Sequence, residues 1–208
     1  MILEWMQSRR SIRKFLPKMP ERALLEQLIA AAITAPSASN KQPWRFLVIT
    51  NPDVKHRMAS AVRAAVERVA ACIEPQFEEA FRAYGDYFTR FETAPVVIVP
   101  LYRPLTLLSS MTGAGLSAAD KKNIACMEEQ SGIVSSSLAM ENILLMAHDV
   151  GLGASGLTGP LIAMDALREL LAVPGGWNIV ALIAVGYPDE QPIAPARKSP
   201  ADVTRWII

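Results

Sequence analysis

The chain of 208 residues is long enough to form one full domain with a sizeable core. Apolar residues make up 51% and charged residues 20%, which excludes an intrinsically disordered chain. Lysine and arginine total 21 against 20 for aspartate and glutamate, and this net charge of +1 argues against a surface built to bind nucleic acid or an anionic membrane.

Helical spacing of apolar residues predicts three helices in the first half of the chain, over residues 21–35, 52–72 and 76–92. Pro36 ends the first of them, and Pro52 is suited to open the second.

Two β-rich runs, at residues 44–50 and 94–102, predict buried strands. The second half of the chain adds a long helix over residues 131–150, which is small and apolar almost all round and is therefore expected to pack on several sides. A short amphipathic helix at 164–172 and another buried strand at 178–187 complete the pattern.

Few strands, much helix and no regular strand–helix alternation predict a three-layer α+β domain rather than a Rossmann sheet. We expect a single domain over residues 1–208. Residues 103–130 are less regular, which is typical of a lid, a binding loop or a mobile segment. The proline-rich tail at 189–208 ends in exposed apolar residues, so we expect it to lie on a second subunit.

The cysteines and histidines predict neither a disulfide framework nor a metal site. The chain holds only Cys72, Cys126, His56 and His148, and their spacings match no zinc signature. The N-terminus has no long apolar core and predicts no signal peptide, and polar residues interrupt the apolar stretch 133–150, which therefore predicts no membrane span. Reduced thiols without an export signal favour the cytoplasm.

Four cations and two hydroxyl groups lie within residues 8–14. Arg9, Arg10 and Arg13 carry guanidinium groups, which bind phosphate oxygens in bidentate fashion, so this segment is a candidate anion site. The same charges fit a solvated basic face or a short nucleic-acid arm, and the cluster alone does not decide between them. The pair Arg197-Lys198 in the tail is uninformative by itself.

Two further segments carry small and polar residues. Residues 35–44 offer small side chains that let a flat ligand approach the backbone, and the amides of Asn40 and Gln42 suit a heterocycle edge, although an ordinary helix-to-strand loop has the same composition. Residues 151–160 are rich in glycine. They lack the Gly-Lys-Ser/Thr ending of a phosphate loop and follow a helix, and Gly151 has the place of a helix cap.

Together, these motifs resemble the nitroreductase superfamily of FMN-dependent oxidoreductases. Their order is RRSIRKF, APSASNKQPWRF, a small-residue helix ending in GLGASGLTGP, and a buried strand followed by GYP and a late Arg-Lys pair. The resemblance covers nearly the whole chain, and RRSIR and PSASNKQPW are its specific parts. It implies an α+β sandwich with a mixed central sheet flanked by helices. It also implies an intertwined homodimer with two flavin sites at the interface, which would give the tail its partner surface.

The resemblance implies a tightly bound FMN that is held by three segments. These are Arg9, Arg10, Ser11 and Arg13; then Pro36, Ser37, Ala38, Asn40 and Gln42 from the other subunit; and finally Gly156, Leu157, Thr158 and Gly159 beside the flavin N5. Arg197, with Lys198, would close over the phosphate, and Ser39 with Arg13 would touch the nicotinamide cofactor. Some relatives carry an acid at the position of Thr158, which leaves open how this chain tunes N5.

The implied activity needs no Ser/His/Asp set, because the flavin carries the hydride chemistry. NAD(P)H would reduce the flavin, and a nitroaromatic, a quinone or another electron-poor small molecule would then reoxidise it in a ping-pong cycle. His148, on the long apolar helix, is expected to be a buried structural residue. The alternatives are an FMN-dependent dehydrogenase or a specialised reductase of one metabolite, a non-catalytic flavin-binding or sensory protein, and a nucleic-acid module that uses the RRSIRK arm.

Overall fold

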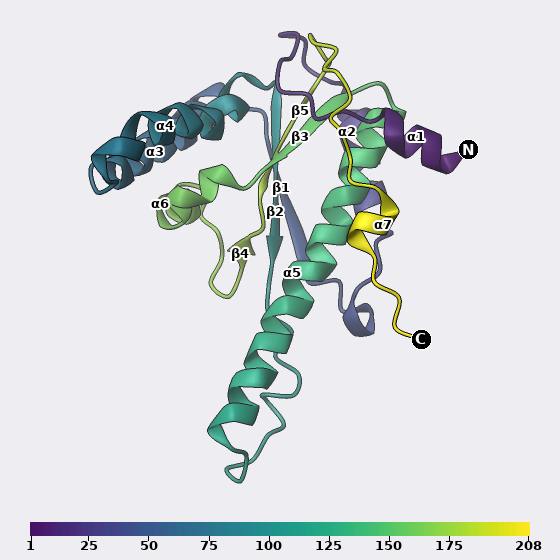
Figure 1. The fold of residues 1–208 in the computed structure, drawn as a ribbon, viewed down its shortest axis with the longest axis vertical. Helices are drawn as coiled ribbons and strands as arrows, with labels where there is room; N and C mark the ends of the chain where they lie inside the picture. The colour runs from purple at the N-terminus through teal and green to yellow at the C-terminus, as the bar shows by residue number, and fades with distance from the viewer.

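The computed structural model describes all residues from 1 to 208 as a sheet with helices on both faces (Figure 1). The α-helices are α1 (Ile2–Ser8), α2 (Arg22–Ala32), α3 (Pro52–Ala70), α4 (Pro75–Gly85), α5 (Ala118–Asp149), α6 (Met164–Leu170) and α7 (Pro200–Val203). Three 3-10 helices are η1 (Ala38–Asn40), η2 (Asp86–Thr93) and η3 (Gly159–Ala163). The strands are β1 (Trp44–Ile49), β2 (Val96–Tyr102), β3 (Gly153–Leu157), β4 (Asn178–Ile179) and β5 (Leu182–Gly186).

The sheet has the strand order β1-β2-β5-β3, and β4 pairs with the end of β2. All pairings between these strands are antiparallel. The sheet is mixed only through an isolated parallel bridge between Ser11 and Ala154, which adds the N-terminal segment to the outer edge of β3. β1 and β3 are therefore the outer strands of the sheet path.

The side chains of β2 alternate between two hydrophobic cores, as expected for a strand buried on both faces. Val97, Val99 and Leu101 belong to the core covered by α3, η2 and α6. Val96 and Ile98 belong to the opposite core, which α2 and α5 cover. The two groups of helices lie on opposite sides of the sheet in Figure 1. These layers confirm the predicted three-layer α+β sandwich.

Local signals explain several helix boundaries. The Asn51 side chain accepts hydrogen bonds from the backbone N–H groups of Asp53 (2.9 Å) and Val54 (3.4 Å), and Pro52 occupies the first helical position, so α3 begins where the sequence predicts. Ser117 caps α5 in the same way by accepting from the N–H of Asp120 at 3.1 Å.

The structure corrects four details of the predicted elements. The single helix predicted at 76–92 is α4 followed by η2, and they meet at Gly85, where an added Cβ would lie 2.5 Å from Val66 Cγ1. The irregular segment predicted at 103–130 is a loop only as far as Ser117, because α5 starts at Ala118. The strand predicted at 178–187 is two strands, β4 and β5, and the glycine-rich segment contains the strand β3.

None of the helices combines the length and the apolar character needed to cross a bilayer.

Candidate functional site

The N-terminal basic segment docks on the free edge of β3. The N–H of Ile12 donates to the carbonyl of Ala154 at 3.0 Å. Beyond it, the N–H of Leu16 donates to the carbonyl of Tyr187 at 2.9 Å. The three motifs RRSIRKF, GLGAS and GYP, which are far apart in the sequence, therefore lie side by side.

Glu190 fastens this arrangement. Its Oε1 accepts hydrogen bonds from the backbone N–H groups of Arg13 (2.5 Å) and Lys14 (3.0 Å). The carboxylate thus bonds to the backbone, and it forms no ion pair with a guanidinium group of the segment. No carboxylate of the chain therefore pairs with the guanidinium groups of Arg9, Arg10 and Arg13.

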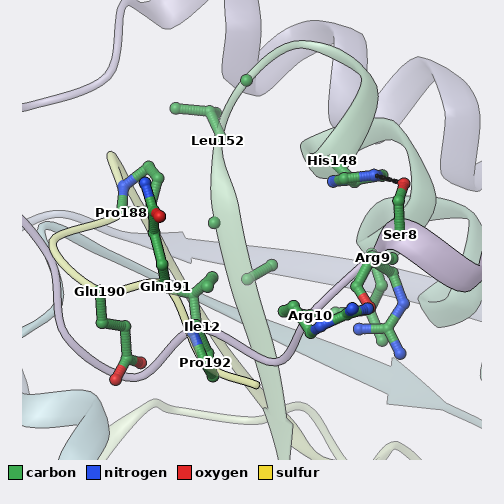
Figure 2. Close-up of a pocket in the computed structure, with 14 residues that line it drawn as sticks. Ser8, Arg9, Arg10, Ile12, His148, Leu152, Pro188, Glu190, Gln191 and Pro192 are labelled. Carbon is green, nitrogen blue, oxygen red and sulfur yellow. Dashed lines mark hydrogen bonds between the residues drawn. The ribbon is translucent and has the colours of Figure 1, made fainter. Parts of the chain in front are cut away.

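A cavity of about 440 Å³ opens where these segments meet (Figure 2). Arg9 and Arg10 line it together with Ser8, His148, residues 151–154 and Glu190. Figure 2 shows the two arginines grouped with Ser8 and His148, whereas Glu190 lies on the other side of the strand in this view. The cavity therefore has a cationic side formed by the segment that follows α1.

His148 anchors the end of α1 at this cavity. Ser8 Oγ lies 2.7 Å from the carbonyl oxygen of Trp5 and 2.7 Å from His148 Nε2, so the hydroxyl links the end of α1 to the imidazole. The imidazole also lies against the Trp5 ring, with the ring centroids 5.5 Å apart. His148 was predicted to be buried, and this prediction was wrong, because the residue is half-buried and lines the cavity.

A neighbouring cavity of about 340 Å³ brings the two ends of the chain together. Arg9 and Arg10 line it with Arg197 of the tail, and no acidic residue does. Nη1 of Arg10 donates hydrogen bonds to the carbonyls of Gln7 and Arg9 at 2.6 and 3.0 Å. These bonds hold the guanidinium group against the end of α1. Guanidinium groups are suited to donate to phosphate or carboxylate oxygens, and three of them line these adjacent cavities.

The other residues predicted for the N-terminal and glycine-rich segments lie beside these cavities but do not line them. Ser11 is bridged to Ala154, and the exposed Arg13 donates to the carbonyl of Ser11 at 3.2 Å. Lys198 is exposed. The other predicted residues lie at the end of β3 and just after it: Gly156, Leu157, Thr158 and Gly159. The first of them, Gly156, is three strand residues, or about 10 Å, beyond Gly153. Edge strand β3 thus connects the cationic cavities with the segment predicted to lie beside a flavin.

The loop that contains Pro36, Ser37 and Ala38 lies elsewhere, against α5. It lines a different cavity of about 380 Å³ with Met127, Val134 and other residues of that helix. This cavity shares no residue with the two cationic ones, so one chain alone does not bring the loop and the arginines together.

This loop has an unusual backbone. Ser39, Asn40 and Gln42 have φ angles of 50°, 51° and 47°, in the left-handed region that non-glycine residues adopt at a cost. Two side-chain hydrogen bonds within the loop hold this backbone. Ser37 Oγ accepts from the N–H of Gln42 at 3.0 Å, and Gln42 Nε2 donates to Asn40 Oδ1 at 3.3 Å. Backbone strain of this kind is typical of functional loops that the surrounding structure holds in place.

Sequence reasoning missed His148, Glu190 and Gly153 as residues of this site. A Cβ at Gly153 would lie 2.7 Å from Ile12 Cβ, so only glycine allows the N-terminal segment to approach β3 this closely. The partners of His148 and Glu190 are 140 and 177 positions away in the sequence, and no local pattern reports such contacts.

The chain is an α+β protein, a three-layer sandwich with a cluster of arginines beside its edge strand β3. The sequence profile of the nitroreductase family matches residues 6–187, and the chain belongs to this family. The family assignment confirms the resemblance that the motifs show.

Known proteins resemble the chain over nearly its full length. An iodotyrosine deiodinase from Haliscomenobacter hydrossis is 29% identical over 195 residues, which are 92% of this chain and 81% of the relative. A BluB-like flavoprotein from Clostridium difficile shares the fold with a TM-score of 0.86 at 22% identity, over 100% and 99% of the two chains. An iodotyrosine deiodinase solved with FMN and 3-iodo-L-tyrosine shares it with a TM-score of 0.74 at 21% identity, over 100% of both chains.

Proposed function

We propose that this protein is an FMN-dependent oxidoreductase that takes a hydride from NAD(P)H and reduces a nitroaromatic, a quinone or another electron-poor acceptor. The observation that carries the proposal is the convergence of Arg9 and Arg10 with Arg197 around adjacent cavities beside β3. Membership of the nitroreductase family and the FMN in the solved iodotyrosine deiodinase support the choice of cofactor.

The donors present fit FMN. Its phosphate would be held by the three guanidinium groups, with His148 and Ser8 keeping the end of α1 in place. Its ring system would extend along β3 towards Gly156 and Thr158, where the strand edge is exposed. When bound, the flavin supplies the hydride transfer, and the protein supplies binding, orientation and electrostatics.

We further propose that the strained loop serves the partner subunit of a homodimer. Its separation from the arginines within one chain supports this arrangement, because the loop then has no flavin of its own to bind. In the dimer, Pro36–Ala38 would lie against the flavin of the partner, with Asn40 and Gln42 presenting amide groups to it.

A specialised reductase of one metabolite is the second candidate. The deiodinase from Haliscomenobacter hydrossis and the deiodinase structure with 3-iodo-L-tyrosine favour this candidate, since both match almost the whole chain. A flavin-binding protein without NAD(P)H oxidation is the third, and the same arginines would serve it.

The first experiment is a visible absorbance spectrum of the purified protein, followed by anaerobic addition of NADPH and then of NADH. We expect a flavin spectrum that bleaches with at least one donor and returns on addition of nitrofurazone or menadione. Bleaching by dithionite alone, with return on addition of 3-iodotyrosine, would favour the specialised reductase. A colourless protein that does not take up added FMN would contradict the proposed function.

Replacement of Arg9 and Arg197 together by glutamine tests the phosphate assignment. Because each charge-assisted hydrogen bond contributes about 1.5–3 kcal/mol, the double variant should bind FMN at least about a hundredfold more weakly while it stays folded. Flavin fluorescence quenching measures the affinity, and circular dichroism checks the fold. The exposed Arg68→Gln in α3 is the matched control. A double variant that stays yellow after gel filtration would remove these arginines from the site.

A further inference from the structure

A second cationic cluster lies at the other end of the sheet, where β1 begins and β2 ends. Pairing places Arg45 of β1 opposite Leu101 of β2, and Leu101 opposite Ile179 of β4. Trp177, just before β4, is 8% exposed. The guanidinium carbons of Arg45 and Arg103 lie 4.4 and 5.5 Å from the centroid of its ring. Arg45 of β1 and Arg103, which directly follows β2, thus share one buried aromatic ring.

Stacking on an aromatic ring holds a guanidinium group in place and leaves the N–H groups at its edge free to donate. Neither Arg45 nor Arg103 takes part in an ion pair, and neither does Lys41 of the preceding loop. Other arginines of the chain donate to protein acceptors through their side chains: Arg10, Arg13, Arg22, Arg63, Arg82 and Arg168. The cluster therefore has oriented donors and no acceptor within the chain.

One acidic residue, Glu129 of α5, already has a hydrogen-bond partner at the end of β2. Tyr102, at the end of β2, donates its hydroxyl proton to Glu129 of α5. Burial, together with the neighbouring Glu129, raises the pKa of Tyr102 to about 12, so the hydroxyl keeps its proton at neutral pH. Glu129 is thereby held at the tyrosine and is not paired with either arginine.

A cavity of about 280 Å³ adjoins the cluster. Lys41 and Arg103 line it with residues 104–107, and no acidic side chain does. Its walls are otherwise backbone, threonine and aliphatic side chains. The cavity therefore combines room for a ligand with cations on one side.

We propose that Lys41 and Arg103, which line this cavity, form a second anion subsite for an oxyanion group of a ligand, with Arg45 adding its charge from the neighbouring Trp177 ring. Guanidinium and ammonium donors suit both phosphate and carboxylate oxygens. If the proposed function holds, the group belongs either to the phosphate of a nicotinamide dinucleotide or to the carboxylate of the acceptor. Lys41 lies within the strained loop, between Asn40 and Gln42, so the subsite adjoins the segment proposed to reach the flavin of the partner.

Calorimetric titration of the purified protein, as isolated, tests the subsite with two pairs of probes. The pair 2′-AMP and adenosine differs by a phosphate, and the pair benzoate and benzamide differs by a carboxylate. We expect at least one anion to bind at least about tenfold more tightly than its uncharged counterpart. Tighter binding of 2′-AMP assigns the subsite to a nucleotide phosphate, and tighter binding of benzoate assigns it to a carboxylate.

Variants locate the binding. Arg45→Gln together with Arg103→Gln should weaken the preferred anion at least about tenfold, and Lys41→Gln, in an exposed loop position, should weaken it several-fold without disturbing Trp177. Arg57→Gln, an exposed cation on α3, should leave it unchanged. Anions that bind no better than the uncharged probes, or binding that the double variant and Lys41→Gln both retain, would overturn the proposal. The titration needs no hydride transfer, so an inactive or colourless protein would contradict the proposed function and not this subsite.

Discussion

At the scale of single residues, the cationic site depends on close approaches that only small side chains permit. Gly153 is the clearest case, because Ile12 occupies the space in which a Cβ would lie. The contact involves Cβ and both γ carbons of a β-branched side chain, at 2.7–2.8 Å, so a rotamer change cannot relieve it. A larger residue must move the segment that carries Arg9 and Arg10.

We therefore predict that Gly153→Ala weakens both FMN binding and the fold. Overpacking should cost about 1–3 kcal/mol of stability and displace the N-terminal segment from β3, which lowers FMN affinity at least about tenfold. Thermal unfolding and flavin fluorescence titration measure the two effects. Gly113→Ala is the matched control, because nothing lies within 4 Å of a Cβ there. Unchanged affinity in a destabilised Gly153→Ala protein would show that the segment does not position the arginines.

The site residues divide into those that the sequence predicts and those that it does not. Arg9, Arg10 and Arg197 were predicted through the order of the motifs, and the structure places all three around adjacent cavities. His148 and Glu190 were not, because each acts through a partner in another segment. A histidine on an apolar helix and a glutamate in a loop carry no sign of such a partner.

At the scale of elements, pairing with a neighbouring strand decides whether a segment of weak local propensity forms a strand. The strand β3 has the sequence GASGL, which is poor in strand-forming residues, and it forms because each of its residues pairs with β5. The start of α5 had a usable signal that the prediction passed over. Ser117 followed by Asp120 is an N-cap with an acid in the first turn, and it marks the boundary between the loop and the helix.

Glu128 holds the 103–117 loop against α5. Its carboxylate accepts from the N–H and the hydroxyl of Ser109 at 3.0 and 2.5 Å, and its backbone carbonyl accepts from the N–H of Leu105 at 3.2 Å. The hydroxyl and backbone hydrogen bonds of Ser109 lower the pKa of Glu128 below its usual value. A carboxyl with a lowered pKa stabilises the folded loop above its unfolded pKa, and this contribution is lost as the pH falls through the lowered value.

We predict that acidification releases this loop before the core unfolds. Hydrogen exchange, corrected for the intrinsic effect of pH, should rise for residues 103–117 at acid pH while β2 stays protected. Glu128→Gln should show fast loop exchange already at neutral pH, because the amide lacks the charge that Ser109 stabilises. Glu79→Gln, at an exposed position of α4, serves as the control. Equal exchange in the wild type and Glu128→Gln at neutral pH would mean that other contacts hold the loop.

At the scale of the whole molecule, the C-terminal tail stands out because its apolar residues have no cover within one chain. Trp206 is 83% exposed, and Ile207 and Ile208 are more exposed still. The helix α5 also exposes apolar residues, among them Val134 and Leu138. Large exposed apolar side chains of this kind mark protein interfaces, which agrees with the homodimer that we propose.

We predict that removal of residues 200–208 weakens the dimer and leaves the cationic site intact. The shortened chain keeps Glu190 and Arg197, but it loses the exposed apolar side chains of Val203, Trp206, Ile207 and Ile208, each of which contributes about 1.5–3 kcal/mol when buried. Dimerisation should weaken at least about a hundredfold. Light scattering over a range of protein concentrations measures this change. Trp206→Ser in the untruncated chain removes only one of these side chains and should weaken dimerisation less. A shortened protein that stays fully dimeric would exclude the tail from the interface.

The meeting of Arg9 and Arg10 with Arg197 also has a consequence for biosynthesis. Arg9 and Arg10 precede every strand of the sheet in the chain and Arg197 follows the last of them, so the third arginine leaves the ribosome after the whole sheet. The sheet can assemble earlier, because β5 ends at Gly186. A nascent chain stalled between Gly186 and Arg197 would hold a nearly finished sheet with only two of the three arginines, and the complete anion site would form only after Arg197 emerges.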